Sequence, residues 1–598
     1  MSSTPTSRAT GLDFRDVQVD VEKRADGTMI LRNTRPFTVP TDRFYDYLKL
    51  WAHKTPDAIF MAERAGEGWR KISYKEAWAQ VRAIASALLT RNLSPDRPVM
   101  ILSGNGIDHQ LVGLASMLAG VPYAPLSVAY STISQDFGKL KDIMTRLNPG
   151  LVFVTHAAPF ARALTIPEMA GREIVIGVGA ETVPGATPFA ELLKGGSGDV
   201  DAQDAKNTSD TIAKFLFTSG STGVPKGVIT THKMMCSNLD MMTDIWPFVT
   251  RRPPVVLDWL PWSHVFGGTF CVGLVMKTGG TFYVDDGKPM PSEAPKTLRN
   301  LREISPTLYW SVPKGFEVIL AEMDRDPAFA KCFFADLDIM FYAGASLPEP
   351  VMRGLETHAQ QTVGKVIPML TSWGLTETAP SITTVNRLRA GTGNVGVPNA
   401  GLELKLIPNG EKLEARVRGP SIMPGYWKMP EQTHGAFDDE GFFITGDAML
   451  FMNMINPGMG LRFDGRVSED FKLLTGTWVN VGGMRGKISA ALAGIVSDFV
   501  IAGADRDDLG LILFPLPTST RSVDETKAAA QQALREHNKT AAGSSEKIAR
   551  AILADLPPSL DAGEITDKGS LNSRLILTRR DHIVAKLYDA NDADVIKM

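Results

Sequence analysis

The chain lacks the features of secreted proteins and of proteins built on cysteine. Its 598 residues include only three cysteines, Cys236, Cys271 and Cys332, which are widely separated and form no C-x-x-C pair. This scarcity argues against a disulfide framework or a zinc site made of cysteines, and it fits a reducing compartment. The first ten residues are polar and contain no apolar signal-peptide core. We therefore expect a cytoplasmic protein.

Long hydrophobic runs and an excess of one charge are also missing. The segment most like a membrane span, residues 111–130, is interrupted by Gly120, Pro122 and Pro125. We interpret it as a buried helix followed by a buried strand. The net charge is only −3, which does not favour nucleic acid or an anionic membrane as a partner. We expect no nucleic-acid partner and no membrane span, and we leave a homodimer open.

The remaining sequence has the composition of a large globular protein. Hydrophobic residues account for 44% of the chain, and its length indicates two or more domains. Apolar runs typical of buried strands alternate with helical patterns, which predicts α/β architecture with sheets covered on both faces. The expected strands are 99–102, 150–154, 173–177 and 255–260, and the expected helices are 107–119 and 232–246.

The pattern changes after Gly391. Residues 402–408 and 412–418 alternate apolar and polar side chains around Asn409-Gly410, which predicts a β-hairpin. We expect an N-terminal domain over residues 1–464, with a β-rich subdomain at about 391–464, and a small α+β domain over residues 465–598. In the small domain we expect strands at 498–502 and 510–514 and a helix around 525–536.

The most informative segment is Thr218-Ser-Gly-Ser-Thr-Gly-Val-Pro-Lys-Gly227, which follows an expected strand at 213–217. Glycine lets a backbone approach a ligand closely, and successive N–H groups and hydroxyls can surround phosphate oxygens. Lys226 adds a mobile positive charge. The segment does not fit the pattern G-x-x-x-x-G-K-[ST], and a flexible Ser/Gly linker is the alternative. Because linkers rarely end in Pro-Lys-Gly, we interpret it as a phosphate-binding loop of another kind.

A second glycine pattern has a different interpretation. Gly391-Thr-Gly-Asn-Val-Gly396 matches the dinucleotide pattern G-x-G-x-x-G, which requires a helix that opens at its last glycine. Pro398 follows almost at once and does not allow one. We expect a loop here.

Three further motifs carry groups suited to a nucleotide. After an expected strand at 365–370, Trp373 could lie against a purine, Thr376 could bond a phosphate and Glu377 could hold Mg²⁺. A helix cap with an acidic first turn is the alternative. Farther along, Asp447 could accept both ribose hydroxyls, and Arg466 could bond the same sugar or a phosphate. Taken alone, each of these two motifs also fits a turn or a surface ion pair.

In their order along the chain, these motifs resemble the adenylate-forming superfamily, which includes acyl-CoA synthetases, peptide-synthetase adenylation domains and luciferases. The resemblance extends from about residue 40 to 580, and residues 121–139 and 469–479 are most similar to feruloyl-CoA synthetases. It implies a ligase that uses ATP, Mg²⁺ and coenzyme A to convert a hydroxycinnamic acid such as ferulate into its CoA thioester, in aromatic acid catabolism. The motifs that carry it are residues 218–227, Tyr342-Ala-Gly-Ala-Ser-Leu347, Trp373-Gly-Leu-Thr-Glu377, Thr445-Gly-Asp447, Gly465-Arg466 and a C-terminal Lys-Gly.

The resemblance also implies roles for individual residues. Thr376 is expected at the α-phosphate, Glu377 at Mg²⁺, and Asp447 with Arg466 at the ribose. The expected adenine site is Gly344, Ala345, Ser346 and Trp373. The expected contacts to the terminal phosphates are Thr218, Ser219, Gly220, Ser221, Thr222, Gly223 and Lys226.

For catalysis, the resemblance implies Lys568 as the adenylation lysine, with Lys487 as the second choice because the Thr-Asp-Lys-Gly order departs from the family's usual Gly-Lys ending. His264 is expected to gate the acyl pocket or merely to pack. The remaining expected pocket residues are Phe266, Val312 and Gly344.

The small domain is expected to rotate between the two half-reactions, exchanging Lys568 for a CoA-side face near Lys472. The pivot position is occupied by Ser468, where the family commonly has Asp or Lys, so Glu469 is a further candidate. Alternative functions are a fatty acyl-CoA synthetase, another aryl-CoA ligase, a ligase that loads a carrier protein, or an inactive homologue that only binds a nucleotide. No carrier segment follows residue 580, which favours a free acceptor.

Overall fold

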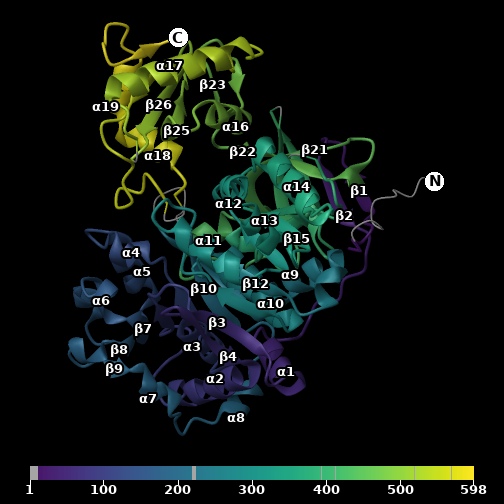
Figure 1. Ribbon diagram of the computed structural model, residues 1–598, viewed down its shortest axis with the longest axis vertical. Helices are drawn as coiled ribbons and strands as arrows, with labels where there is room; N and C mark the ends of the chain where they lie inside the picture. The colour runs from purple at the N-terminus through teal and green to yellow at the C-terminus, as the bar shows by residue number, and fades with distance from the viewer. Residues whose placement is uncertain (1–10, 219–223, 392, 411, 518, 567–568) are drawn as a thin grey trace.

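The computed structural model describes residues 11–218, 224–391, 393–410, 412–517, 519–566 and 569–598. They form a large N-terminal α/β domain and a small C-terminal domain, which lies at the top of Figure 1. This confirms the predicted fold class. The boundary at residues 464 and 465 stays a prediction.

The first sheet of the large domain contains the expected apolar strands. It has seven strands, and its order is β11-β10-β6-β5-β7-β8-β9. Strands β5 to β10 are parallel where they pair, and β11 closes the edge antiparallel to β10. The strands are β5 (Val99–Ile101), β6 (Tyr123–Pro125), β7 (Leu151–His156), β8 (Glu173–Val178), β9 (Thr187–Pro188), β10 (Ile212–Thr218) and β11 (Lys226–Thr231).

Helices cover this sheet for reasons visible in the sequence. Ser73 caps α2 (Tyr74–Leu88) by accepting a hydrogen bond from the Glu76 N–H, and the Glu76 carboxylate accepts one from the Ser73 N–H in return. In α3 (Ile107–Leu118), every residue except Asp108 is buried, as expected of a helix that is apolar on all sides. The segment at residues 111–130 is thus a buried helix followed by the short strand β6, as predicted. Among the described residues no helix combines the length and the apolar character that crossing a bilayer requires.

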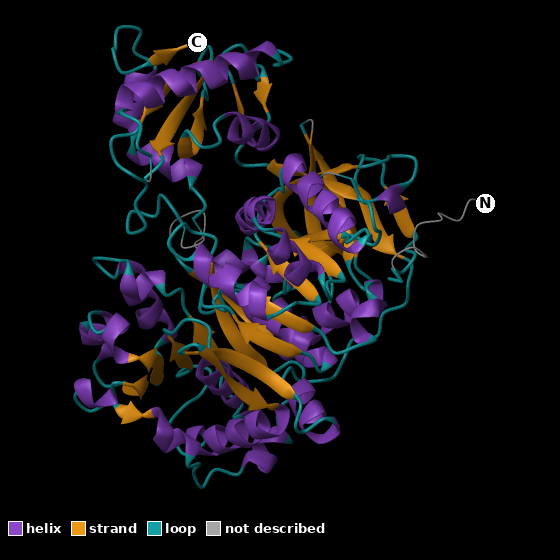
Figure 2. Cartoon of the chain, viewed as in Figure 1, coloured by secondary structure: helices purple, strands orange, loops and turns teal. Residues whose placement is uncertain are grey.

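A second sheet of the large domain has the order β12-β13-β3-β4. Figure 2 shows helices packed against the orange strands in this part of the molecule. The sheet strands are β3 (Ile59–Ala65), β4 (Gly68–Ser73), β12 (Val255–Asp258) and β13 (Thr281–Val284). The other helices of the large domain are α1 (Asp46–Lys54), α4 (Ala129–Thr132), α5 (Gly138–Leu147), α6 (Ala157–Phe160), α7 (Phe189–Leu193), α8 (Val200–Asp204), α9 (His232–Ile245), α10 (Val272–Thr278), α11 (Ala294–Glu303), α12 (Pro313–Arg325), α13 (Pro327–Phe334), α14 (Glu349–Val363) and α15 (Pro430–His434).

The third sheet has eleven strands and joins distant parts of the chain. Its order is β1-β2-β19-β20-β21-β22-β18-β17-β16-β15-β14. The N-terminal strand β2 pairs with β19, where Leu31 faces Leu404, and Figure 1 shows the purple β1 and β2 in the same sheet as the green β21. The strands are β1 (Val19–Lys23), β2 (Met29–Asn33), β14 (Leu308–Ser311), β15 (Ile339–Tyr342), β16 (Met369–Gly374), β17 (Ser381–Thr384), β18 (Asn394–Pro398), β19 (Glu403–Asn409), β20 (Lys412–Arg418), β21 (Phe443–Phe451) and β22 (Leu461–Arg466).

The predicted hairpin is confirmed, and two other local predictions are corrected. Strands β19 and β20 are antiparallel, and Asn409 pairs with Lys412 at the turn. The strand expected at 365–370 begins only at Met369, because Pro368 has no N–H with which to join the sheet. The segment after Gly391 is not wholly a loop: Gly396 lies within β18, and no helix opens there.

The C-terminal domain packs helices against a four-stranded sheet with the order β25-β26-β27-β28. Its apolar core includes Phe499, Leu511 and Leu534, from the strands and the helix expected in this region. Its elements are β23 (Phe471–Lys472), β24 (Trp478–Val479), α16 (Val481–Ala491), β25 (Val496–Ala502), β26 (Leu509–Pro515), α17 (Val523–Lys539), β27 (Ile548–Leu553), α18 (Ser573–Arg579), α19 (Asp581–Leu587) and β28 (Ile596–Lys597).

Candidate active site

Three neighbouring parallel strands bring the expected site segments to one edge. Strand β15 pairs in parallel with β14 on one side and with β16 on the other. The segments that leave their carboxyl ends contain Val312, Gly344 and Thr376. In open α/β sheets, ligands bind beyond the carboxyl ends of such strands. Segments far apart in the sequence thus converge where a ligand site is expected.

Glu377 occupies a short 3₁₀ turn, Thr376–Thr378, directly after β16. Its side chain is buried, and its Oε1 accepts a hydrogen bond of 3.0 Å from the Tyr426 hydroxyl. Burial and the adjacent carboxylate raise the pKa of Tyr426, so this phenol stays protonated and donates. Glu377 is therefore a fixed carboxylate with a hard oxygen of the kind that Mg²⁺ prefers.

Tyr426 also contacts the expected phosphate-binding segment, residues 218–227, which we call the phosphate segment. The Lys226 ammonium lies 4.9 Å from the centre of the Tyr426 ring, within the range of a cation–π contact. The backbone of the tyrosine segment pairs with β11, and the Trp427 N–H donates to the Gly227 carbonyl at 2.7 Å. Tyr426 was not among the expected site residues, although the aromatic pair Tyr426-Trp427 was a visible signal.

The phosphate segment itself differs from expectation in one respect. Lys226 and Gly227 do not lie on a loop but begin β11, and Lys226 pairs with Thr218 of β10. The cause is the antiparallel pairing of β11 with β10, which extends to Lys226 and Thr218. The expected residues Ser219, Gly220, Ser221, Thr222 and Gly223 lie outside the described residues. The structure therefore fixes the two ends of the expected phosphate loop.

Asp447 is buried between Trp373, which is also buried, and the exposed Arg466. The Trp373 indole N–H donates to Asp447 Oδ2 at 2.9 Å, and strands β21 and β22 pair Asp447 with Arg466. The Arg466 Nε is 3.4 Å from Asp447 Oδ1, but the geometry is too poor for a hydrogen bond, and this oxygen has no such partner among the described residues. An unsatisfied buried acceptor suits a ligand hydroxyl, such as that of a ribose.

Electrostatics agree with this arrangement. Burial raises the pKa of Asp447, and the nearby Arg466 cation and the Trp373 hydrogen bond oppose the rise. The neighbouring carboxylates of Glu469 and Glu377 raise it further. Trp373, which donates to Asp447, lies in β16 directly before the turn that carries Glu377, so Asp447 and Glu377 belong to one region of the structure. Because Trp373 is itself buried, its role at the adenine stays a prediction.

Gly344 has a backbone conformation that most residues disfavour. Its φ is +87°, in the left-handed region. A Cβ atom there would meet only Val312 Cγ1, at 3.9 Å. Glycine is therefore favoured at position 344 by the backbone conformation and not by a steric clash with a neighbouring residue. Ala345 and Ser346 follow it on an exposed turn, and their adenine contacts stay predictions.

The expected acyl gate lies at the start of a π-helix, Phe266–Cys271. The Gly268 N–H donates to the His264 carbonyl at 2.8 Å. A Cβ atom on Gly268 would come within 2.1 Å of the Trp262 carbonyl oxygen, so only glycine permits this fold-back. Phe266 is half-buried, and its ring centre lies 5.5 Å from that of Phe341 in β15. The gate segment thus packs directly against the strand that leads to Gly344.

A buried lysine links this helix to the phosphate segment. Lys214 lies in β10, is fully buried, and donates to the Gly268 carbonyl at 2.8 Å. Burial lowers the pKa of Lys214 from its usual 10.5 to about 7. The sequence signal was a lysine within the apolar run 213–217, but its partner is 54 residues away.

This lysine predicts a pH-dependent stability. Between about pH 7 and 10.5 the native state has lost a proton that the unfolded state keeps, so the free energy of unfolding rises with pH. The gain is on the order of 5 kcal/mol over that window. Replacing Lys214 by methionine should remove it, which urea unfolding followed by tryptophan fluorescence at pH 7 and pH 9.5 would measure. An unchanged pH dependence would contradict the assignment, and Lys539→Met, at an exposed lysine, serves as the control.

The structure leaves the roles of the C-terminal candidates untested. Lys568 lies outside the described residues, and the nearby Ile565 and Leu571 form a β-bridge. Lys487, the second choice, forms an ion pair of 2.8 Å with Glu546 within the small domain. Lys472 lies over Trp478 at 4.9 Å on the exposed β23–β24 hairpin. These contacts leave all three assigned roles as predictions.

The region of the expected pivot is a turn between β22 and β23. The Val467 N–H donates to the Gly446 carbonyl at 2.9 Å, and the Glu469 N–H donates to the Arg466 carbonyl at 3.2 Å. Ser468 lies between these two bonded positions and is exposed. Both Ser468 and Glu469 remain candidates for the pivot. Among the described residues, no cluster of three or more His, Cys, Asp or Glu side chains could hold a metal ion.

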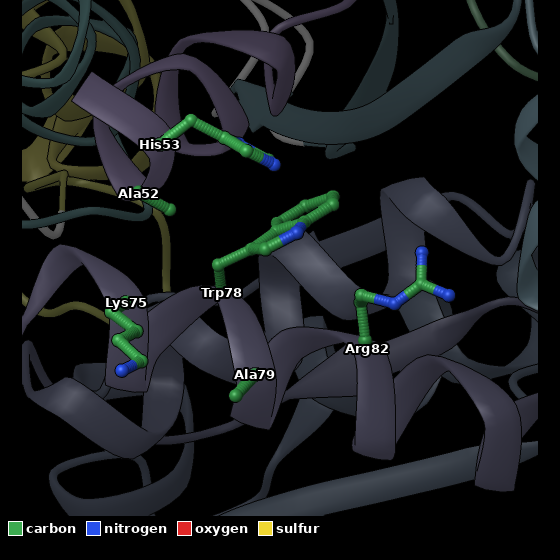
Figure 3. Close-up of a pocket in the computed structure, with 6 residues that line it drawn as sticks. All are labelled: Ala52, His53, Lys75, Trp78, Ala79 and Arg82. Atoms are coloured by element: carbon green, nitrogen blue, oxygen red, sulfur yellow. The ribbon is translucent and has the colours of Figure 1, made fainter. Parts of the chain in front are cut away.

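A separate hollow lies between α1 and α2, away from these groups. It measures about 460 Å³ and has the Trp78 ring at its centre (Figure 3). The Arg82 guanidinium at its edge is bound by the Asp201 carboxylate at 2.7 and 3.0 Å. None of its lining residues belongs to the site. They are Ala52, His53, Lys75, Trp78, Ala79 and Arg82.

Comparisons with known proteins agree with the geometry. The chain is 29% identical over 262 residues to a malonate–CoA ligase of Arabidopsis thaliana, covering 40% of each protein. It is 24% identical over 540 residues to a carboxylic acid reductase of Mycobacterium tuberculosis, covering 83% of this chain and 44% of the reductase. A feruloyl-CoA synthase of an Amycolatopsis species is 28% identical over 324 residues, which is 50% of this chain and 60% of the synthase. The chain therefore spans less than half the length of the first two relatives.

Solved structures share the fold. ATP-bound MatB from Rhodopseudomonas palustris superposes with a TM-score of 0.69 at 20% identity, over 91% of this chain and 100% of that one. The anthranilate CoA ligase AuaEII superposes with a TM-score of 0.72 at 15% identity, over 92% and 99%.

Family models match both parts of the chain. The model of the AMP-binding enzyme matches residues 48–427, and that of the AMP-binding enzyme C-terminal domain matches residues 470–592. The first match alone covers more than half of the sequence and includes the β10–β11 hairpin, Glu377 and Tyr426. The predicted resemblance to the adenylate-forming superfamily is therefore confirmed, and the chain belongs to the AMP-binding enzyme family.

Proposed function

We propose that the protein is an acid–CoA ligase that forms AMP and pyrophosphate. The observation that carries the proposal is the buried Asp447 oxygen without a hydrogen-bond partner, beside Arg466 and close to the Glu377–Tyr426–Lys226 group. An acceptor for a sugar thus lies next to a carboxylate and a cation suited to metal-bound phosphates. ATP would account for all of these groups if its ribose lies at Asp447 and Arg466 and its phosphates lie at Glu377 and Lys226.

In the first half-reaction, a substrate carboxylate oxygen attacks the α-phosphorus of ATP, and the bond to the pyrophosphate oxygen breaks. The acid is thereby converted from a poor acyl donor into one with AMP as leaving group. Thr376 and Lys568 would stabilise the charge that develops at the α-phosphate, and Lys226 would neutralise the departing pyrophosphate. Asp447 and Arg466 would hold the ribose in register with these groups. Mg²⁺, held by Glu377, would neutralise phosphate charge when bound.

In the second half-reaction, the CoA thiolate attacks the acyl carbonyl carbon. The carbon–oxygen bond to AMP breaks, AMP leaves, and the thioester forms. A rotation of the C-terminal domain about the turn at Ser468 and Glu469 would exchange the Lys568 loop for the face near Lys472. The small hydrogen-bonded turn there is the kind of segment that can absorb a change in backbone angles.

For the acid, we propose a hydroxycinnamate such as ferulate. A flat phenolic ring fits a slot with a glycine at one side and an aromatic ring at the other. Gly344 and Phe266 would supply these two elements, with Val312 next to Gly344. His264 is proposed to lie beside the carboxylate. The feruloyl-CoA synthase among the relatives supports this choice, while the malonate–CoA ligase makes a small aliphatic acid the main alternative.

The test is pyrophosphate release with a panel of acids, with and without CoA. We expect the fastest release with ferulate or a related cinnamate, and a CoA thioester as product. Preference for malonate or a fatty acid would overturn the hydroxycinnamate proposal. Turnover that yields no thioester in the presence of CoA would overturn the ligase proposal itself.

The Tyr426–Glu377 hydrogen bond gives a further prediction. Tyr426→Phe keeps the ring near Lys226 but removes the hydroxyl that orients the carboxylate. We expect adenylation to slow by about 3- to 10-fold, with a higher Mg²⁺ concentration needed for half-maximal rate. Pyrophosphate exchange over a Mg²⁺ titration would measure both effects. An unchanged Mg²⁺ requirement would argue that Tyr426 does not act through Glu377.

A further inference from the structure

A loop of the C-terminal domain touches the N-terminal domain far along the chain from the turn that connects the two. In Figure 1, a yellow loop descends from the small domain toward α4 and α5. The contact is made by Leu560 and Asp561, whereas the connecting turn lies at residues 467–470. The two domains are therefore joined at two separate places.

Two consecutive residues supply three hydrogen bonds at this contact. The Ser134 hydroxyl donates to Asp561 Oδ1 at 2.6 Å, and the Gln135 N–H donates to Asp561 Oδ2 at 3.0 Å. The Lys139 ammonium donates to the Leu560 carbonyl at 3.0 Å. The Leu560 side chain also packs against an apolar core of the N-terminal domain. Both oxygens of one carboxylate are thus used across the domain boundary.

The N-terminal side of the contact is rigid. The Ser134 hydroxyl oxygen accepts from the Phe137 N–H at 3.0 Å, and Asp136 Oδ1 accepts from the Gly138 N–H at 2.8 Å. These bonds fix the turn that opens α5. The Phe137 ring is buried, with the Arg162 guanidinium 5.1 Å from its centre. The two donors to Asp561 are therefore held in place before the small domain arrives.

The C-terminal side is equally fixed within its own domain. The buried Glu564 carboxylate binds the Arg580 guanidinium at 2.8 and 2.6 Å, and it also accepts from the Ser559 N–H at 2.8 Å. Arg580 further donates to the Leu556 carbonyl at 2.7 Å. Asp561 thus lies on a loop that is hydrogen-bonded to the rest of the small domain. Its contact with the N-terminal domain therefore positions the small domain and not only the loop.

We propose that Asp561 is a positioning residue that holds the C-terminal domain in the orientation used for adenylation, because it binds to the N-terminal domain the segment that leads, seven positions later in the sequence, to the expected adenylation lysine, Lys568. The inference rests on the proposed two-step function. A contact far from the connecting turn is lost after a small rotation, and it therefore stabilises one orientation over others. Asp561 is exposed, and exposed polar contacts are individually weak. A weak contact is suitable here, because it must break once in every catalytic cycle.

The first test separates the two half-reactions. Asp561→Ala should slow ATP–pyrophosphate exchange with the best acid of the panel by roughly fivefold, because the adenylating orientation is less populated. Thioester formation from supplied acyl-adenylate and CoA should remain as fast as in the unaltered protein, or become faster. Asp594→Ala is the matched control, since Asp594 is an exposed carboxylate paired with Lys527 inside the same domain. Equal exchange rates, or equal losses in both half-reactions, would overturn the proposal.

The second test reports the contact itself. With Cys332 replaced by serine, Ser134→Cys and Asp561→Cys are joined by a short thiol-specific cross-linker. We expect efficient cross-linking, retained pyrophosphate exchange, and loss of thioester formation that returns when a cleavable linker is cut. Poor cross-linking, or full thioester formation by the cross-linked protein, would overturn the proposal. If no acid supports exchange in the unaltered protein, the proposed function fails, whereas the cross-linking yield still decides whether the contact exists.

Discussion

Replacing Lys568 by alanine is expected to reduce acyl-adenylate formation by about 10²- to 10³-fold, the usual effect of removing one donor to charge that develops in a transition state. Because the proposed role of Lys568 is confined to the first half-reaction, thioester formation from supplied acyl-adenylate should continue. Pyrophosphate exchange and single-turnover thioester formation measure the two steps separately. Equal loss of both would contradict the assigned role.

Two matched substitutions sharpen this result. Lys487→Ala should change the adenylation rate less than twofold, since Lys487 forms an ion pair with Glu546. A large loss of adenylation in this variant would instead make Lys487 the adenylation lysine. Lys226→Ala should slow adenylation by only about tenfold, because its charge neutralises a leaving group at some distance from the attacked phosphorus. The order Lys568, Lys226, Lys487 is thus the expected ranking of the three lysines.

The second large effect is expected at Glu377. Glu377→Gln keeps the size of the side chain and its contact with the Tyr426 hydroxyl but removes the negative charge. We expect adenylation to fall by about 10²- to 10³-fold, with most of the loss appearing as a higher Mg²⁺ requirement. A Mg²⁺ titration of pyrophosphate exchange, compared with Tyr426→Phe, measures this. A uniform loss at every Mg²⁺ concentration would instead indicate damage to the fold around β16.

Local sequence patterns predicted those elements whose cause is local. The β19–β20 hairpin follows from alternation around Asn409-Gly410, and the buried α3 follows from its apolar composition. Glu377 and Asp447 were identified as candidate ligands because their motifs stand in a known order along the chain; Glu377 follows the end of β16, whereas Asp447 lies within β21. What such patterns specify is the identity and the approximate place of a functional group.

Contacts between distant segments were not predictable in this way. Strand β2 pairs with the distant β19, and the Arg32–Glu403 ion pair joins residues whose numbers differ by 371. Tyr426 reaches Glu377 across 49 residues and Asp561 reaches Ser134 across 427. Such pairings depend on the packed arrangement of whole sheets and domains, and no local propensity encodes them. Pro368, by contrast, was a local signal that should have shifted the expected start of β16.

The most direct measurement of the central claim is the stoichiometry of products in one reaction. The protein, ATP, Mg²⁺, CoA and ferulate are incubated together, and AMP, pyrophosphate and CoA thioester are quantified by mass spectrometry and an enzymatic phosphate assay. We expect equal amounts of all three, and no AMP when Asp447, whose buried oxygen is assigned to the ribose, is replaced by leucine. Formation of ADP and phosphate, or of AMP and pyrophosphate without any thioester for any acid of the panel, would contradict the central claim.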